Sequence, residues 1–339
     1  MTKKKIVISG MRPTGPLHIG HLLGTLNNWL LLQRNRNNEC YFLIADYQVL
    51  DDHLNDVRKG KIPENVKEMV ADWIAVGLDP QKSYFVLQSQ VPQLSELTFY
   101  FSYLVTVARL RRNPTLKDKA NSVGIDVEKD KIPLGFLGYP VSQAADILLF
   151  KGEYVPVGED QLPHLEQTRE IARKFNRYFK KVFPEPKPII SESPRILGLD
   201  GRKMSKSFGN AILLSDKPEI IKKKVRKAMT DSGREIRYLP NKKPMISNLM
   251  RIYSGVSGEE IKKIENKFKG KGYNDFKKDL GEIIVKTLYP IQERRKKVIN
   301  DNRLIKEVLE KGTERAREIG EGTMKEVREV VFQYRKNLF

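Results

Sequence analysis

Two histidines, His18 and His21, lie three residues apart where a helix is predicted to begin. They follow an apolar strand predicted at residues 5–9 and a loop, Gly-Met-Arg-Pro-Thr-Gly, at 10–15. Residues at this spacing share one face of a helix, and the positive end of the helix dipole attracts phosphate. A loop that joins a strand to a helix is also where doubly wound folds bind nucleotides, although this one matches neither common glycine-rich phosphate motif. Taken alone, such a pair is more often an ordinary capping or surface arrangement.

A second loop with chemical potential lies at residues 198–210, between glycines. It presents Lys203 and Lys206 together with Ser205 and Ser207. Lysine ammonium groups on a mobile loop can close on a transferring phosphate and stabilise the charge that develops there. A solvated basic loop is the alternative, and it would suffice for an isolated Lys-x-x-Lys.

One carboxylate, Asp146, stands in the otherwise apolar segment 138–150. A buried carboxylate needs a partner. An indole N–H is only a donor and would use such an acceptor, and a tyrosine hydroxyl could also use it. The alternative is an aspartate at a helix-packing contact or in an ion pair. Farther along, Glu159 and Asp160 open a helix after a glycine turn, which suits ribose hydroxyls and an ammonium group but also the helix dipole.

The elements that must position these residues alternate between strand-like and helix-like segments, which predicts a parallel sheet covered by helices. The predicted class is α/β, a doubly wound, Rossmann-like domain followed by an all-α domain. Four prolines make residues 181–200 a rigid, extended connection. Strands are expected at residues 5–9, 40–45, 84–87 and 154–157, helices at about 18–34, 63–77, 94–111, 141–150 and 159–177, and a basic loop at 112–135.

From residue 216 onward nearly every window has helical period. We place the domain boundary between residues 210 and 211, and the last predicted helix, 321–336, could pack back onto the first domain. Breaks at 231–233, 240–244, 255–258, 269–273 and 311–313 divide the second domain into five or six helices.

Charge is the most informative bulk property, because 62 lysines and arginines oppose 42 acids and leave a net +20 over 339 residues. Residues 1–210 carry a net +7 and residues 211–339 a net +13. Such an excess favours a polyanionic partner, and the C-terminal third is the better candidate for a nucleic-acid surface. Solubility or thermal adaptation is the alternative explanation.

The single cysteine, Cys40, cannot form an internal disulfide or build a zinc or iron–sulfur site by itself. The chain has no run of eighteen apolar residues, and its N-terminus leads into a strand rather than a signal-peptide core. We therefore expect a cytoplasmic protein with no membrane association and no structural metal.

The segments His18-Ile-Gly-His21 and Lys203-Met-Ser-Lys-Ser207 resemble the two signature sequences of class I aminoacyl-tRNA synthetases, in the expected order. Further blocks look like the tryptophanyl-tRNA synthetases of bacterial type, and the similarity covers nearly the whole chain. The resemblance implies activation of L-tryptophan by ATP with Mg²⁺ and transfer to the 3′ end of tRNA(Trp). It also implies a homodimer, with a helical dimerisation region inserted at about residues 91–180 and an anticodon-binding domain at 211–339. These further blocks are Met11-Arg-Pro-Thr-Gly15, Tyr139-Pro-Val-Ser-Gln-Ala-Ala-Asp146 and Val155-Pro-Val-Gly-Glu-Asp-Gln161.

By that resemblance, Asp146 would accept the indole N–H, and His18 and His21 would donate hydrogen bonds to the phosphates in the transition state. Lys119, Lys203 and Lys206 complete the expected catalytic group. The residues expected around the amino group of tryptophan are Tyr139, Gln143 and Gln161. Those expected at ATP are Arg12, Pro13, Thr14, Gly20, His21, Gly158, Glu159, Asp160, Ile196, Lys203, Met204, Ser205, Lys206 and Ser207, with residues 158–160 at the ribose and Ile196 at the adenine.

Two alternatives remain at this point. Tyrosyl-tRNA synthetases are close cousins, and a phenol site differs from an indole site mainly in depth and in what faces the polar atom. A non-catalytic RNA-binding paralogue would keep the fold but should have lost a phosphate contact, and both signature motifs are intact. Two departures from the family stand out. Gln48 occupies a position in the pocket wall where the family often has histidine, and a single cysteine excludes the C-terminal iron–sulfur cluster of some relatives.

Overall fold

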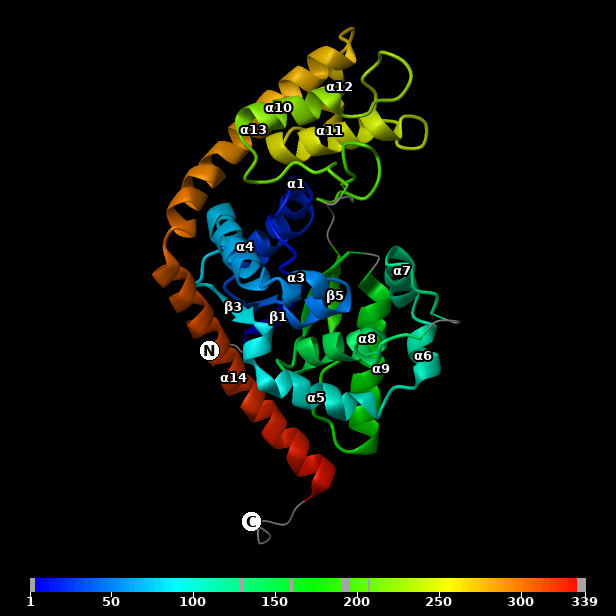
Figure 1. Ribbon diagram of the computed structural model, residues 1–339, viewed down its shortest axis with the longest axis vertical. Helices are drawn as coiled ribbons and strands as arrows, with labels where there is room; N and C mark the ends of the chain where they lie inside the picture. Colours follow the sequence, from blue (N-terminus) through cyan, green and yellow to red (C-terminus); the bar gives the residue numbers. More distant parts are fainter. Residues whose placement is uncertain (1–3, 128–130, 159–160, 191–195, 207, 334–339) are drawn as a thin grey trace.

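Five parallel strands form one sheet, in the order β3-β2-β1-β4-β5, in the computed structural model of the chain (Figure 1). The structure describes residues 4–127, 131–158, 161–190, 196–206 and 208–333. Because β1 lies between β2 and β4, the strand order reverses beside it, and sheets of this kind bind ligands in the crevice at the carboxyl ends there. The predicted doubly wound class is confirmed. The strands are β1 (Lys5–Met11), β2 (Asn38–Ile44), β3 (Ser83–Leu87), β4 (Tyr154–Val157) and β5 (Lys187–Ile190).

Both faces of the sheet are buried. On β2, Cys40, Phe42 and Ile44 belong to one apolar core and Tyr41 and Leu43 to the other, because side chains alternate along a strand. Burial on both faces explains why the strands appear in the sequence as unbroken apolar runs. The first core includes residues of α2 (Asn27–Arg34) and α4 (Ile62–Val76), and the second includes residues of α5 (Pro92–Ser102), α8 (Leu134–Leu148) and α9 (Leu162–Tyr178).

Short helical segments follow the first three strands at the carboxyl edge of the sheet. The predicted helix 18–34 consists of α1 (Ile19–His21), a π-helical stretch η1 (Leu22–Leu26) and α2. These segments place polar side chains at the crevice beside β1. After β2 come η2 (Tyr47–Asp51) and α3 (Leu54–Arg58), and after β3 comes η3 (Gln88–Gln90).

The region after β3 differs from the prediction in three ways. The expected helix 94–111 is two helices, α5 and α6 (Val107–Arg111), and the expected loop 112–135 contains α7 (Pro114–Ser122). The Asn113 side chain caps α7 by accepting the N–H groups of Thr115 and Leu116, a local signal that outweighs the polar composition. Helix α8 begins at Leu134 rather than at residue 141, since Pro140 lies inside the helix without ending it.

The proline-containing connection at residues 181–200 contains a strand, β5, that the sequence did not reveal. Pro188 pairs with Val155 at the edge of the sheet. A proline is tolerated on an edge strand because one side of that strand needs no N–H donor. The prediction of a purely extended linker was therefore wrong over Lys187–Ile190.

The C-terminal part is helical, as predicted. Figure 1 shows a cluster of helices beyond the carboxyl edge of the sheet, from which α13 and then α14 run back along the sheet domain. Across the described ranges, none of the helices combines the length and apolarity that a bilayer crossing requires. The helices are α10 (Pro218–Lys227), α11 (Pro244–Ser257), α12 (Ile261–Lys267), α13 (Tyr273–Ile299) and α14 (Asn302–Phe332).

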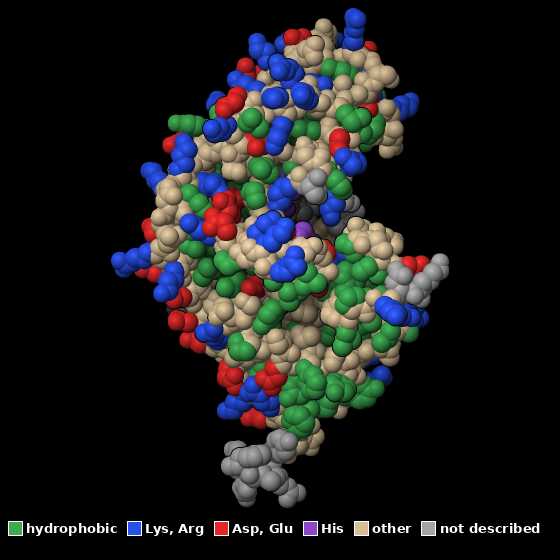
Figure 2. All heavy atoms as spheres, viewed as in Figure 1, with side chains coloured by type: hydrophobic (Ala, Val, Ile, Leu, Met, Phe, Trp, Pro, Cys, Tyr) green, Lys and Arg blue, Asp and Glu red, His purple; other side chains and the backbone are tan. Residues whose placement is uncertain are grey.

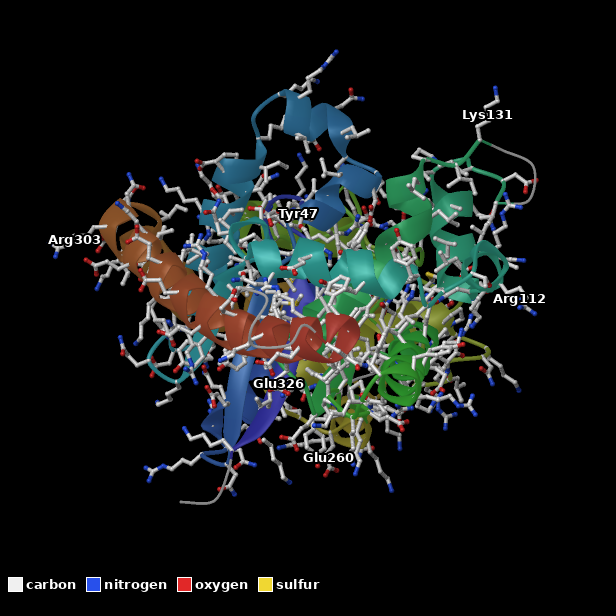
Figure 3. All side chains as sticks on the ribbon, turned by 90° about the horizontal axis from the view of Figure 1, so that it is seen from below. Tyr47, Arg112, Lys131, Glu260, Arg303 and Glu326 are labelled. Carbon is white, nitrogen blue, oxygen red and sulfur yellow. The ribbon has the colours of Figure 1, made fainter. Side chains whose placement is uncertain are left out.

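The predicted break at residues 311–313 is wrong, because α14 continues through it without interruption. Figure 3 looks onto the length of this helix, with Arg303 near its start and Glu326 in its second half. A side chain at Gly312 would overlap the backbone carbonyl of Phe85 on β3. Next to it, Thr313 Oγ1 accepts the N–H of Leu87 at 3.2 Å. The glycine permits close packing of a helix on a strand and does not end the helix.

Candidate active site

The two loops that the sequence singled out are joined by backbone hydrogen bonds. The N–H of Ile19 donates to the carbonyl of Ile212 at 2.9 Å, and the N–H of Leu214 donates to the carbonyl of Leu17 at 2.9 Å. The segment that follows the lysine loop thus pairs with the chain on both sides of His18. Figure 2 shows a hollow at this level, with histidine atoms visible inside it and lysine and arginine side chains around it.

Lys206 makes a polar side-chain contact between the two loops. Its Nζ donates to the carbonyl of Thr14 at 2.7 Å, and burial lowers the pKa of this ammonium to about 8. At Gly15 φ is +115°, a backbone conformation that favours glycine, and a Cβ there would lie 2.7 Å from the same Nζ, so a side chain would also displace the lysine tip. At Gly20 a Cβ would lie 3.2 Å from the sulfur of Met204. Lys203 is exposed.

His18 and His21 stack with their ring centroids 3.7 Å apart. The backbone N–H of His18 donates to Nδ1 of His21 at 3.2 Å, so the proton of neutral His21 is on Nε2. Burial lowers the pKa of His18 to about 4, and burial together with the neighbouring His18 holds the pKa of His21 well below its ordinary value. Both rings are therefore neutral at pH 7, and each keeps one ring N–H that can donate.

A cavity of about 240 Å³ opens at the carboxyl edge of β1 and β4. Asp146 is 6% exposed and accepts amide N–H groups from Gln88 and Gln48. Apolar side chains such as Ile8 and Leu43 form much of the rest of the wall. The cavity brings together five residues predicted for substrate or ATP, namely Arg12, Gln143, Asp146, Gly158 and Gln161.

Two predicted residues lie beside this cavity rather than in its wall. Tyr139 lines an adjoining cavity of about 730 Å³, and its hydroxyl lies 2.9 Å from Nε2 of His164. Lys119 Nζ lies 4.0 Å from the centroid of the Tyr139 ring and pairs with Asp51 at 2.5 Å. Burial lowers the pKa of Lys119. Gln48 belongs to the walls of both cavities and so connects them.

The remaining predicted ATP residues that the structure describes belong to the two loops or lie next to them in the sequence. Pro13 is buried and Thr14, Ser205 and Ile196 are half-buried, with Ile196 packed against the first core. The backbone N–H of Ser205 donates to the Asn210 side chain at 2.8 Å. Glu159, Asp160 and Ser207 lie outside the described residues.

The structure adds polar residues that sequence reasoning missed. Gln88 directly follows β3 and contacts Asp146. Asp51 ends η2 and pairs with Lys119, and Asp52, the next residue, pairs with Arg12. Their only sequence signal is position, because residues that follow parallel strands gather at one edge of the sheet. In the part of the chain that the structure describes, no three histidine, cysteine, aspartate or glutamate side chains are grouped as metal ligands.

Comparison with known proteins gives consistent matches. The family model described as tRNA synthetases class I (W and Y) matches residues 1–289. The tryptophan–tRNA ligase of Clostridium longisporum is 42% identical over 346 residues, which cover 99% of each chain. The tryptophanyl-tRNA synthetase structure from Mycoplasma pneumoniae matches with a TM-score of 0.86 and 27% identity over 99% of this chain and 100% of that one. The enzyme from Campylobacter jejuni complexed with ADP and tryptophan matches with a TM-score of 0.80 and 30% identity over 96% and 98%.

Proposed function

This chain belongs to the class I tRNA synthetases for tryptophan and tyrosine and is a tryptophan–tRNA ligase; on that premise we propose how its residues carry out the reaction. The enzyme joins L-tryptophan to ATP, which gives tryptophanyl-adenylate and diphosphate, and then transfers the tryptophanyl group to the 3′ end of tRNA(Trp) with release of AMP. Relatives that are 42% identical over nearly the full length are tryptophan–tRNA ligases, so the tyrosine and non-catalytic alternatives are not retained. We propose that the reaction takes place in the cytoplasm, where its substrates tRNA and ATP are present.

The observation that carries the tryptophan site is Asp146, a buried carboxylate in the wall of the 240 Å³ cavity. It accepts the indole N–H, a group that can only donate. Gln143 and Gln161 line the same cavity and bind the ammonium group through their side-chain oxygens. Tyr139 supports this wall from the adjoining cavity, on the same helix as Asp146 and Gln143.

ATP binds across the two joined loops. Thr14 and Gly20 border the phosphates, and Lys203, Met204, Ser205, Lys206 and Ser207 close over them. The hydrogen bond between Lys206 and Thr14 supports this closure, because it brings one loop against the other. The other expected contacts are Arg12 and Pro13 at the phosphates, Gly158, Glu159 and Asp160 at the ribose, and Ile196 at the adenine.

In the first step a carboxylate oxygen of tryptophan attacks the α-phosphorus, and the bond from that phosphorus to the oxygen bridging to the β-phosphorus breaks. Diphosphate leaves, and no bond to the protein forms, so the protein positions the reactants and stabilises charge. His21 donates through Nε2–H because its Nδ1 accepts from the chain, and His18 donates beside it. The ammonium groups of Lys203, Lys206 and Lys119 stabilise the charge on the leaving diphosphate.

Mg²⁺ is part of the proposal, carried by ATP rather than by a protein cage. Mg²⁺ usually keeps several waters and binds through substrate phosphates with one or two carboxylates rather than in an all-protein cage. Such an ion supplies partial neutralisation of the triphosphate, and the lysines and histidines named above supply the rest.

We propose that residues 211–339 form a tRNA-binding domain that reads the anticodon. Lysine and arginine side chains gather over this part of the surface in Figure 2. A cavity of about 470 Å³ in this domain has the apolar residues Ile236 and Phe268 in its wall. Its charged lining is four cations, Arg234, Arg237, Lys269 and Lys271, and two acids, Glu235 and Glu265. An unstacked base needs an apolar surface, and its phosphates need cations, so the cavity suits a single-stranded nucleotide.

We propose that the chain acts as a homodimer. The cavity of about 730 Å³ lies among α5, α6 and α8, and the apolar side chains of Phe99, Val107 and Leu134 in its wall are 60%, 52% and 83% exposed. Exposed apolar side chains gathered in this way mark an interaction surface. A second copy covers this face, so sedimentation should show a dimer, and the double change Phe99→Glu and Leu134→Glu should give monomers.

The tryptophan site is tested by charging tRNA(Trp) with radiolabelled tryptophan. We expect Asp146→Ala to raise the KM for tryptophan about 10- to 150-fold, because a hydrogen bond to a charged group contributes about 1.5–3 kcal/mol. Gln33 is another buried polar residue, and it is hydrogen-bonded to Gly77 and Ser83. The control variant Gln33→Met should leave the KM for tryptophan unchanged. A normal tryptophan KM in Asp146→Ala would overturn the assignment.

A further inference from the structure

The carboxylate of Asp146 is held by two glutamine amides. Gln88 Nε2 lies 2.7 Å from Oδ1 and 2.9 Å from Oδ2, and Gln48 Nε2 lies 2.9 Å from Oδ2. Gln88 is fully buried and stands outside the wall of the 240 Å³ cavity, whereas Gln48 is part of that wall. Gln88 therefore contacts Asp146 from the protein interior, and Gln48 contacts it from the cavity wall.

A second contact fixes the orientation of the Gln88 amide. Its Oε1 accepts the backbone N–H of Tyr47, labelled in Figure 3, at 3.0 Å. Turning the amide over would place its oxygen against a carboxylate and its NH₂ group against an N–H, and both contacts would be repulsive. Tyr47 and Gln48 are neighbours in η2, so one short turn orients Gln88 and also supplies the second donor to Asp146.

The contacts also distinguish the two oxygens of Asp146. A carboxylate offers about four acceptor positions, two on each oxygen. Oδ2 receives contacts from both amides and Oδ1 from one. An acceptor position therefore remains on Oδ1, and a single indole N–H can occupy it.

The surroundings otherwise disfavour a charged Asp146. Burial, the largest cause, raises its pKa to about 7, the Asp46 carboxylate also raises it, and the amides of Gln88 and Gln48 lower it. Among the described residues these groups are the ones that shift it, and no lysine or arginine is one of them. Neutral N–H donors thus take the place of a paired cation.

We propose that Gln88 and Gln48 are positioning residues for tryptophan selection, which hold Asp146 as an oriented carboxylate with Oδ1 presented to the indole N–H. The inference rests on the proposed tryptophan site. Glutamine keeps an N–H donor on the carboxylate without adding a group that titrates near neutral pH.

The test measures the KM for tryptophan in ATP–diphosphate exchange from about pH 6 to 9, with the full-length enzyme. In the wild type we expect KM to rise as the pH falls through about 7, since Asp146 then becomes protonated. In Gln88→Met the loss of the donor raises the folded pKa of Asp146, so the midpoint should move up by about one pH unit or more. At pH 7 its KM should be about 5-fold higher or more, with kcat at saturating tryptophan within about twofold of wild type.

Two further variants keep the result interpretable. Gln48 is half-buried and makes one contact to Asp146, which Gln48→Met removes. This variant should raise the midpoint by less than Gln88→Met does. Gln33→Met removes a buried glutamine that contacts Gly77, Asp79 and Ser83, and its midpoint should match the wild type. A KM that rises equally at every pH in Gln88→Met and Gln48→Met, with an unmoved midpoint, would indicate mere structural damage and would overturn the inference.

A substrate without the N–H provides an independent readout. The benzothiophene analogue of tryptophan carries sulfur in place of the N–H, so the wild type should discriminate against it strongly. Gln88→Met should lose part of this discrimination at pH 7, and unchanged discrimination would count against the inference. If Asp146→Ala itself leaves tryptophan KM unchanged, the tryptophan site fails, whereas an effect of Asp146→Ala without an effect of either glutamine change overturns the positioning role alone.

Discussion

Lys206 Nζ donates a hydrogen bond across 2.7 Å to the backbone carbonyl of Thr14, so a cation of one signature loop rests on the loop of the other. The backbone pairing of Leu17 and Ile19 with residues 212–214 holds the bases of the two loops together. A phosphate oxygen that enters between the loops can replace the Thr14 carbonyl as the hydrogen-bond acceptor of the Lys206 ammonium group. The contact thus keeps Lys206 close to where we propose that charge develops in the reaction.

Lys206→Ala should slow adenylate formation much more than it weakens tryptophan binding. A donor aimed at transition-state charge typically contributes about 10²–10³ in rate. We expect a loss of that order in kcat for ATP–diphosphate exchange and a tryptophan KM within about threefold of wild type. Lys325→Ala, an exposed change on α14, is the matched control. Normal kcat with a large loss of tryptophan affinity would contradict this role.

The pH dependence of ATP use should reveal the same lysine. Burial lowers the pKa of Lys206 to about 8, and the group functions when protonated, so its charge is lost as the pH rises through about 8. Since kcat/KM reports the free enzyme, kcat/KM for ATP should fall above about pH 8. Lys206→Arg keeps its charge at these pH values and should shift this fall upward. An identical alkaline limb in both proteins would rule out Lys206 as its source.

Substitution of alanine for Gly312 and for Gly322, both on α14, should change the stability of the protein in opposite directions. A Cβ at Gly312 overlaps the Phe85 carbonyl, so Gly312→Ala should destabilise the protein by about 1–3 kcal/mol or more through overpacking. A Cβ at Gly322 meets no atom within 4 Å, so Gly322→Ala should stabilise by about 0.5–1 kcal/mol through helix propensity. Urea unfolding of the two variants measures both signs. Equal effects would show that α14 does not pack on β3 as described.

Binding of tRNA should depend steeply on salt. Residues 211–339 carry a net +13, and each phosphate neutralised on a single strand contributes about −0.7 to the slope of log K against log salt. Replacing Arg234 and Arg237 by alanine should reduce this slope and weaken binding, with ATP–diphosphate exchange unchanged. Lys151→Ala and Lys187→Ala, which remove two cations from the sheet domain, are the control. A salt-independent affinity would contradict an electrostatic tRNA surface.

The parts of the fold that sequence predicts well are those with a periodic or local signal. The apolar runs of β1 to β4 and the loops of His18 and Lys206 have such signals, and both loops do lie together in the structure. The strand Lys187–Ile190 was missed because Pro188 weighs against a strand, and only its place at the sheet edge makes it acceptable. Gly312 looked like a helix break because its packing partner, Phe85, is remote in sequence.

Side-chain placement was the harder part of the candidate site. Gln88 belongs to no motif, and its importance appears only when η2, η3 and α8 bring three amide contacts onto Asp146. Tyr139 and Asp146 share one helix, yet the structure turns Tyr139 toward His164 and a second cavity. Spacing along a helix predicts which residues can share a face, but the neighbouring elements decide which cavity each one lines.

The central claim is that the cavity of Asp146 and the loops of His18 and Lys206 activate tryptophan. ATP–diphosphate exchange with each of the twenty amino acids tests this claim most directly. We predict exchange with tryptophan alone, lost or strongly impaired at low tryptophan in Asp146→Ala. Exchange with tyrosine in place of tryptophan, or no exchange with any amino acid by a folded enzyme, would contradict the account.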